Sequence, residues 1–500
     1  MVKMTMSVSI AAAVLGAALL MPSATASATY GASLAKPFMQ CRLTDPMQLR
    51  SISAECAEVS VPESDAEGSR RITLSVARIP AINRRKQTDP IVLLAGGPGQ
   101  GAQLSFTAVS TVFSRTGRQR DIVLLDQRGT GRSNMLSCVT ESRSTAETFA
   151  SDTATFVKLN EKCLEKLRST SDLGAYTTSH AVRDLDAVRA LLGYEKLNFY
   201  AASYGTRVAQ HYARRYPERV RSMVLDGVVA PETVLGPEIS LDAQVALNGI
   251  WKRCNADKPC RDRFGDLQSK TKTLQNVLKR KPQRVEIPNP RTGTTESFDF
   301  GAEQLAVVLR FGSYDQYFSA MLPLVVTEAA RGNFHPIGSL FLMTAGSVQD
   351  MIAVGMHNSV VCSEDVPRYD TVSVDRAAVA ATYLGTGFLD ALPQICRNWP
   401  RGLVDGDFFE PLISDVPTLL LSGSLDPVTP PDDAERVARS LKSSRHLVLE
   451  GSGHGQLAIP CMERVLADFY SNADPKALDV RCLDRRVKPP FWISLAGPTP

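Results

Sequence analysis

The sequence predicts an α/β protein: a mostly parallel sheet with helices on both faces and an inserted, mainly helical cap. Three observations lead to this class. Short apolar runs alternate with amphipathic segments over residues 29–235, the segment 236–407 is largely helix-like, and strand-like runs resume within 408–500. Strands that alternate with helices are typical of a parallel sheet covered on both faces. We therefore expect a core in two parts, 29–235 and 408–500, and a cap between them.

The composition is that of an ordinary globular protein. A chain of 500 residues permits one large domain with an insertion or two domains, and 44% hydrophobic with 22% charged residues is common for folded chains. The net charge of +4 is too small to indicate a nucleic-acid partner. We expect none.

Residues 1–28 are expected to form a secretory signal peptide. Lys3 gives a positive start, and Val8 to Leu20 is apolar but too short to span a bilayer. The runs Ala24-Thr25-Ala26 and Ala26-Ser27-Ala28 both fit small-x-small cleavage sites. A retained membrane anchor is the alternative. The prediction is a secreted protein, periplasmic or extracellular, with no stable membrane insertion after cleavage.

Ten cysteines follow the predicted signal peptide. An even number in an exported chain indicates disulfides, although sequence does not fix their connectivity. Zinc, the alternative, needs C-x-x-C or Cys/His clusters, and the sequence contains none, so we expect no metal and no cofactor. We expect pairing in chain order: Cys41 with Cys56, Cys138 with Cys163, Cys254 with Cys260, Cys362 with Cys396, and Cys461 with Cys482.

Each part of the chain contributes recognisable elements. In the first part, strands are expected within 72–81, 90–95, 121–126, 197–201 and 222–229, and an amphipathic helix over 179–193. The cap has helix-like runs at 241–257, 303–332 and 375–385. Strands resume at 416–422 and 444–450. Ligands of such sheets bind beyond the carboxyl ends of the strands.

Ser203 lies in a tight connection between an expected strand, Leu197 to Ala201, and an expected helix, Thr206 to Tyr216. A serine at a sharp strand-to-helix turn is a nucleophile elbow, whose usual pattern is G-x-S-x-G. Here the pattern is A-x-S-x-G, because Ala201 takes the place of the first glycine. The alternative is an ordinary small-residue turn before a helix.

A serine nucleophile needs a histidine base held by a carboxylate. Of the six histidines, His454 follows an expected strand in the loop "GSGHG", and Asp426 follows another in "SGSLDPVTP". The chain order Ser203, Asp426, His454 is the α/β-hydrolase order. These three residues are the predicted catalytic triad.

An oxyanion hole is the second requirement. The main-chain N–H of Tyr204, directly after the serine, is one expected donor, and that of Gly97 in "GGPGQG" is the other. A phosphate-binding loop is a weaker interpretation of "GGPGQG", because the G-K-[ST] ending is missing.

The segments "GGPGQG", "DQRGTGRS", "ASYGT", "SGSLDPVTP" and "GSGHG" together resemble those of the α/β hydrolases of the prolyl aminopeptidase and tripeptidyl aminopeptidase (TAP-like) group of serine peptidases. The resemblance covers most of the mature chain and is weaker in the cap. Two residues depart from the common pattern: Ala95, where many members have histidine, and Ala201. The resemblance implies that Asp126 and Arg128 brace the loops around the site.

The resemblance also implies that carboxylates in the cap hold the substrate's free α-amine. Glu364 or Asp365, in "CSED", would suit this role, because a desolvated ammonium group needs a charged acceptor. The alternative is a polar turn beside a disulfide at Cys362.

These observations predict a secreted serine aminopeptidase that releases one or a few residues from peptides with a free N-terminus. A carboxylesterase with the same triad is the first alternative, since both reactions pass through an acyl-enzyme. A non-catalytic binding protein on a hydrolase scaffold is the second, but it would be expected to lack a triad residue. The preferred residue, the number of residues released and the oligomeric state stay open.

Overall fold

The computed structural model describes residues 31–45, 49–138 and 153–498, so the predicted signal peptide lies outside the described residues. Nine strands form one sheet in the order β1-β2-β3-β5-β4-β6-β7-β10-β11. The six strands from β5 to β11 in this order are parallel, whereas β1, β2 and β3 pair antiparallel with their neighbours. The strands are β1 (Ser33–Thr44), β2 (Ser51–Pro62), β3 (Arg71–Ile79), β4 (Ile91–Leu94), β5 (Ile122–Leu125), β6 (Leu197–Ala202), β7 (Val220–Asp226), β10 (Thr418–Gly423) and β11 (Ser444–Leu449).

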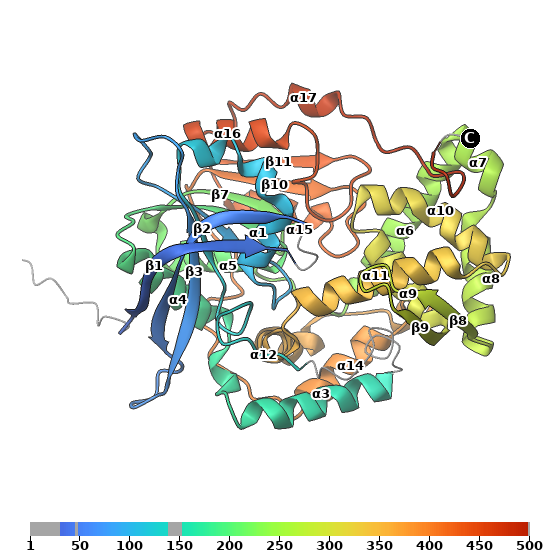
Figure 1. Ribbon diagram of the computed structural model, residues 1–500, viewed down its shortest axis with the longest axis horizontal. Helices are drawn as coiled ribbons and strands as arrows, with labels where there is room; N and C mark the ends of the chain where they lie inside the picture. The colour runs from blue at the N-terminus through green and yellow to red at the C-terminus, as the bar shows by residue number, and fades with distance from the viewer. Residues whose placement is uncertain (1–30, 46–48, 139–152, 499–500) are drawn as a thin grey trace, which may run out of the picture.

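Helices cover both faces of this sheet, as the alternating pattern predicts (Figure 1). Strand residues alternate between the two faces. Val92 and Leu94 pack into the hydrophobic cluster that includes α4 and α5, while Ile91 and Leu93 pack into the cluster that includes α1 and α16. The covering helices are α1 (Ala102–Val109), α4 (Thr178–Leu191), α5 (Tyr204–Arg215), α15 (Pro431–Ser440) and α16 (Met462–Asn472).

A separate hydrophobic cluster forms the cap, on the right of Figure 1. Its elements are α6 (Ile239–Ala256), α7 (Lys258–Phe264), α8 (Leu267–Arg280), β8 (Gln283–Pro288), β9 (Thr295–Phe300), α9 (Ala302–Gly312), α10 (Gln316–Ala330) and α11 (His335–Met351). β8 and β9 form an antiparallel hairpin, which the helix-like pattern does not predict. Phe491, near the end of the chain, belongs to the same cluster, so the C-terminal segment returns to the cap.

The rest of the inserted segment packs with the core instead. The helices α12 (Val354–Glu364) and α14 (Gly387–Cys396) contribute Val360, Val361 and Ile395 to the cluster on the α4/α5 face of the sheet. α3 (Thr153–Arg168) lies beside α14 (Figure 1). The short helices α13 (Arg376–Ala380) and α17 (Arg481–Asp484) complete the fold. The segment 236–407 thus contributes to two hydrophobic clusters, and its helix α12 is almost wholly buried.

The ten cysteines form five disulfides in the chain-order pairing that the sequence predicts. Cys362–Cys396 joins α12 to α14, which fixes the part of the insertion that packs on the core. Among the residues that the structure describes, no helix combines the length and apolarity that crossing a bilayer requires.

Candidate active site

Ser203 sits at a strained turn between β6 and α5. Its backbone has φ 55° and ψ −127°, a conformation that non-glycine residues rarely adopt. The helix begins at Tyr204, two residues earlier than the sequence pattern predicts, so no residue separates Ser203 from the helix. Such strain persists only where the surrounding structure enforces it, and it is characteristic of active sites.

The glycines around the elbow are required by close packing. A Cβ atom on Gly205 would lie 2.7 Å from the carbonyl oxygen of Ala95. A Cβ atom on Gly96 would lie 2.9 Å from the Cβ of Ser203. Both distances are shorter than real Cβ contacts. The loop after β4 and the elbow can therefore lie this close together only because both positions are glycine. Ala201 is fully buried within β6, where it replaces the first glycine of the usual pattern.

Asp426 holds His454 in a fixed orientation. The Nδ1 of His454 lies 2.8 Å from Oδ2 of Asp426. The hydroxyl of Thr429 donates to the same oxygen at 2.9 Å and lies 3.1 Å from Nδ1. The main-chain N–H groups of Val428 and Thr429 donate to Oδ1 at 3.0 and 2.9 Å. The carboxylate is thus buried and oriented, leaving Nε2 of His454 as the free nitrogen that can act as base.

The imidazole of His454 lies next to the end of β7, the neighbour of strand β6, which carries the elbow. A Cβ atom on Gly227 would lie 2.8 Å from Cε1 of His454. The residue before it, Asp226, accepts a hydrogen bond from the main-chain N–H of Ser203 at 2.9 Å. Within the described residues no hydrogen bond joins the Ser203 hydroxyl to His454; in serine hydrolases this bond shortens when substrate binds.

The pKa of His454 is raised above its ordinary value of 6.5. Burial alone would lower it, but the charge of Asp426 and the hydrogen bond to it act in the opposite direction, and Asp226 adds to them. The positive charge of Arg310 opposes the rise. The imidazolium that forms when a serine proton is taken up is therefore stabilised.

No hydrogen bond within the described residues uses the main-chain N–H of Tyr204 or that of Gly97. Tyr204 is the first residue of α5, where the helix leaves its initial N–H groups unpaired. Gly96, by contrast, donates to the side chain of Gln100 at 3.2 Å. The main-chain N–H groups of Gly97 and Tyr204 are thus not used within the described residues, and their role in an oxyanion hole stays a prediction.

The inserted segment touches both catalytic loops. The main-chain N–H of Ala353 donates to the carbonyl of Gly99 at 3.0 Å, beside the oxyanion loop. His357, which is half-buried, bonds to the backbone of Pro98 in the same loop. On the other side, the main-chain N–H of His454 donates to the carbonyl of Tyr314 at 2.7 Å, and the two rings meet edge to face at 5.1 Å.

Glu364 and Asp365 do not line an open pocket. Both carboxylates are buried and bonded to the core. Glu364 accepts from the N–H and hydroxyl of Thr178 at 2.7 and 2.9 Å. Asp365 accepts from Arg207 at 3.1 Å and from the N–H of Leu235 at 2.9 Å. Both carboxylates are thus held by groups of the chain itself, and their contact with a substrate amine stays a prediction.

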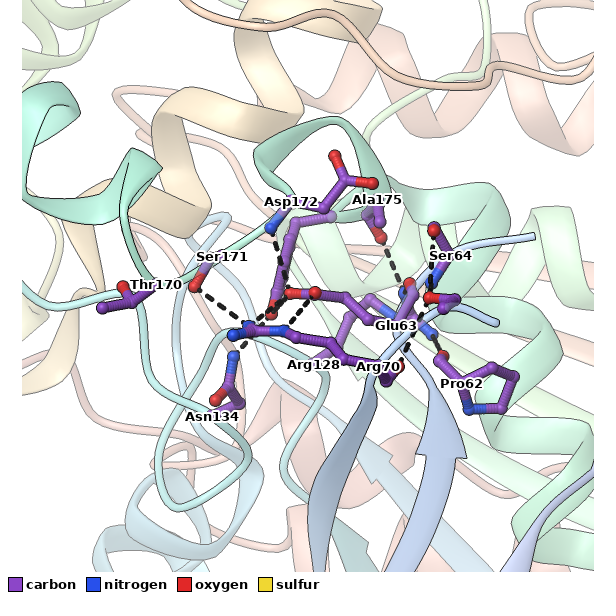
Figure 2. Close-up of polar contacts among 12 residues, drawn as sticks. Pro62, Glu63, Ser64, Arg70, Arg128, Asn134, Thr170, Ser171, Asp172 and Ala175 are labelled. Carbon is purple, nitrogen blue, oxygen red and sulfur yellow. Dashed lines mark hydrogen bonds and ion pairs between the residues drawn. The ribbon is translucent and has the colours of Figure 1, made fainter. Parts of the chain in front are cut away.

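Arg128 and Asp126 brace the loops around the site. Arg128 is fully buried and donates to the carbonyls of Glu63 and Ala175 at 2.6 and 2.7 Å, as Figure 2 shows, and it forms a bidentate pair with Asp184. Asp126 accepts from the N–H groups that begin α1 and from the loop after β5. Neither side chain contacts the triad.

Three residues near the triad have no clear sequence signal: Thr429, Tyr314 and Arg310. Thr429 is three residues after Asp426, a spacing that a turn pattern could have suggested. Tyr314 and Arg310 belong to the cap and reach the site only through the fold. Within the described residues no three His, Cys, Asp or Glu side chains are placed to share a metal ion.

Comparison with known families agrees with this geometry. Residues 89–250 match the family described as alpha/beta hydrolase fold, and residues 381–482 match the family described as TAP-like protein. These two matches cover the elbow, the acid and the histidine.

Several curated proteins are similar to this chain. A tripeptidyl aminopeptidase of Streptomyces coelicolor is 34% identical over 40% of this chain, and the match spans 39% of its own length. The serine protease Hip1 of Mycobacterium tuberculosis is 29% identical over 83% of this chain and 84% of its own. A carboxylesterase B of Mycobacterium tuberculosis is 32% identical over 47% of this chain and 49% of its own.

Proposed function

The chain belongs to the α/β hydrolases, as a TAP-like serine peptidase, and on that premise we propose that it is an exported aminopeptidase. It would release one or a few residues from the N-terminus of peptides. The observation that carries the proposal is the convergence of Ser203, His454 and Asp426 at three strand ends, beside the unpaired N–H groups of Tyr204 and Gly97.

The proposed reaction follows from these positions. Nε2 of His454 takes the proton of Ser203, whose Oγ bonds to the carbonyl carbon of the substrate. The carbonyl oxygen becomes negative and accepts hydrogen bonds from Tyr204 and Gly97. The imidazolium then gives its proton to the leaving amine as the C–N bond breaks, which leaves an ester on Ser203. Water, activated by the same histidine, hydrolyses this acyl-enzyme.

A free substrate amine needs an acidic partner near the site, and Asp242 on α6 is the residue that we propose. Its carboxylate is half-buried and has no hydrogen-bond partner among the described residues. Burial raises its pKa to about 7, and the negative charges of Glu238, Asp433 and Asp426 contribute. A bound ammonium group would relieve this unfavourable environment, since an opposite charge lowers the pKa of a carboxyl.

The disulfides, the predicted signal peptide and the similarity to Hip1 support export. The similarity to a carboxylesterase supports a second candidate, an esterase that uses the same acyl-enzyme.

The test is a panel of chromogenic amides with one, two or three residues, each with a free or an acetylated N-terminus, beside p-nitrophenyl acetate. The proposal predicts cleavage of the free amides and little cleavage of the acetylated ones. Equal cleavage of both would exclude the aminopeptidase. Activity on the ester alone would favour the esterase.

A further inference from the structure

Arg310, on α9, is a buried cation without an acidic partner. The residue is 6% exposed. Nη2 donates to the hydroxyl of Tyr314 at 3.3 Å, and Nη1 is buried with no hydrogen-bond partner in the described chain. No carboxylate of the described residues lies within ion-pair distance of it. A buried charge is ordinarily paired, because leaving water without a partner is costly.

Aromatic rings surround the guanidinium but do not satisfy its donors. Its centre lies 5.0 Å from the ring of Phe388, 5.9 Å from that of Phe311 and 6.0 Å from that of Tyr314. Ring contacts stabilise the positive charge, whereas the N–H groups at the edge of the guanidinium need an oxygen in their plane. A carboxylate matches that edge with two parallel hydrogen bonds.

Arg310 is linked to the catalytic histidine through one residue, Tyr314. Tyr314, the hydrogen-bond partner of Arg310, contacts the ring and the main chain of His454. The positive charge of Arg310 lowers the pKa values of His454, Asp242 and Tyr383. In each case this effect is smaller than that of burial. The hydroxyl of Tyr383 is a second buried group without a partner. Phe388 is 39% exposed, so this aromatic wall reaches solvent.

We propose that Arg310 binds a carboxylate of the substrate and selects peptides that carry one next to the scissile bond. The carboxylate can be an acidic side chain or the free C-terminus of a short peptide. The proposal rests on the proposed function, in which Asp242 holds the amine. With a negative group and a positive group both unpaired near His454, the site is complementary to a short peptide with charges of both signs.

The test compares kcat/KM for matched substrates that differ by one charge. One arm uses a glutamate and a glutamine residue next to the scissile bond, with the C-terminus amidated. The other arm uses a peptide with a free C-terminus and its C-terminal amide. In at least one arm, the wild type should prefer the charged substrate by about 10- to 100-fold, the effect of one charge-assisted pair. The arm that shows the preference identifies the source of the carboxylate.

The variants are Arg310→Met and Arg310→Lys, with Arg253→Met as the matched control. Arg253 is another cap arginine with unpaired buried donors, and its guanidinium stacks on Phe491 at 4.2 Å. Arg310→Met should abolish the preference, Arg310→Lys should reduce it, and Arg253→Met should keep it. If Arg310→Met does not fold, the comparison of the charge preference in kcat/KM between the wild type and Arg310→Lys decides the test.

A second readout separates this proposal from the proposed function. N-acetylglutamine, which carries one carboxylate, should inhibit hydrolysis of p-nitrophenyl acetate about 10-fold more strongly than its C-terminal amide, which carries none, in the wild type, and equally in Arg310→Met. This comparison requires no peptide cleavage, so it holds even if the enzyme is an esterase. Equal inhibition in the wild type, together with no charge preference in either arm, would overturn the role of Arg310. A preference that survives in Arg310→Met would also overturn it.

Discussion

The main-chain N–H of His454 donates a 2.7 Å hydrogen bond to the carbonyl of Tyr314, so the catalytic loop after β11 rests directly on the cap. The residue before the histidine, Gly453, packs so closely on Ser313 and Tyr314 that a Cβ atom would overlap their carbonyl oxygens. The position of the base therefore depends on a part of the chain more than a hundred residues away.

Gly453→Ala should displace this loop and lower kcat. A shift of about 1 Å in a catalytic group can cost about 100-fold in rate, which is the loss that we expect. Gly406→Ala is the control, since a Cβ atom there meets nothing within 4 Å. Single-turnover acylation by p-nitrophenyl acetate measures the effect. Wild-type rates in Gly453→Ala would show that the contact with Tyr314 does not position the base.

The activity should fall as the pH is lowered through the pKa of His454, because the protonated imidazole cannot accept the serine proton. That pKa is raised by Asp426, so the acid limb of kcat/KM should lie above pH 6.5. Asp426→Asn removes the charge, and the acid limb of its residual activity should move to lower pH. A neutral ester is the suitable substrate, because its rate does not depend on Asp242. Acid limbs at the same pH in both proteins would contradict this account of the base.

Asp242→Asn should weaken the hydrolysis of substrates with a free amine by about 10- to 100-fold in kcat/KM, because a charged acceptor is lost. The hydrolysis of p-nitrophenyl acetate should stay within about twofold, since that ester has no amine. The ratio of the two rates is the measurement. A free-amine preference that is unchanged in Asp242→Asn would remove Asp242 from the amine site.

Asp365→Ala should destabilise the fold. Arg207 and Asp365 form a buried ion pair at 3.1 Å, with side chains that are 1% and 0% exposed. Removing one partner of such a pair leaves an uncompensated charge and costs about 3–5 kcal/mol of the free energy of unfolding. Denaturant unfolding measures this change. Glu364→Gln, a milder change at the adjacent buried carboxyl, should keep the full preference for free amines, and loss of that preference would restore Glu364 as the amine anchor.

The core of the site can be predicted from the sequence because its residues follow strands. Ser203, Asp426 and His454 each come after a short apolar run and lie among glycine or other small residues, so parallel pairing brings them to one edge of the sheet. The main-chain donors follow from the same turns. Local sequence carries this information, since each loop needs only its own strand to be placed.

The cap is less predictable because its contacts are long-range. Glu364 and Asp365 look like a polar turn, but Thr178 and Arg207, 186 and 158 residues away, bind them inside the core. The β8–β9 hairpin does carry a sequence signal within a segment that is otherwise helical. Apolar residues stand at alternate positions, Val285 and Ile287 in β8 and Phe298 and Phe300 in β9, and all four are buried. Arg310 has no local signal, because its place beside His454 depends on how α9 packs.

Labelling by a fluorophosphonate, followed by peptide mass mapping, tests the central claim most directly. The account predicts a single adduct on Ser203 in the wild type. Ser203→Ala should carry no adduct and lose turnover by roughly 10⁴- to 10⁶-fold, and His454→Ala should label far more slowly because its serine is not activated. An adduct on another residue, or near-normal turnover in Ser203→Ala, would contradict the proposed mechanism.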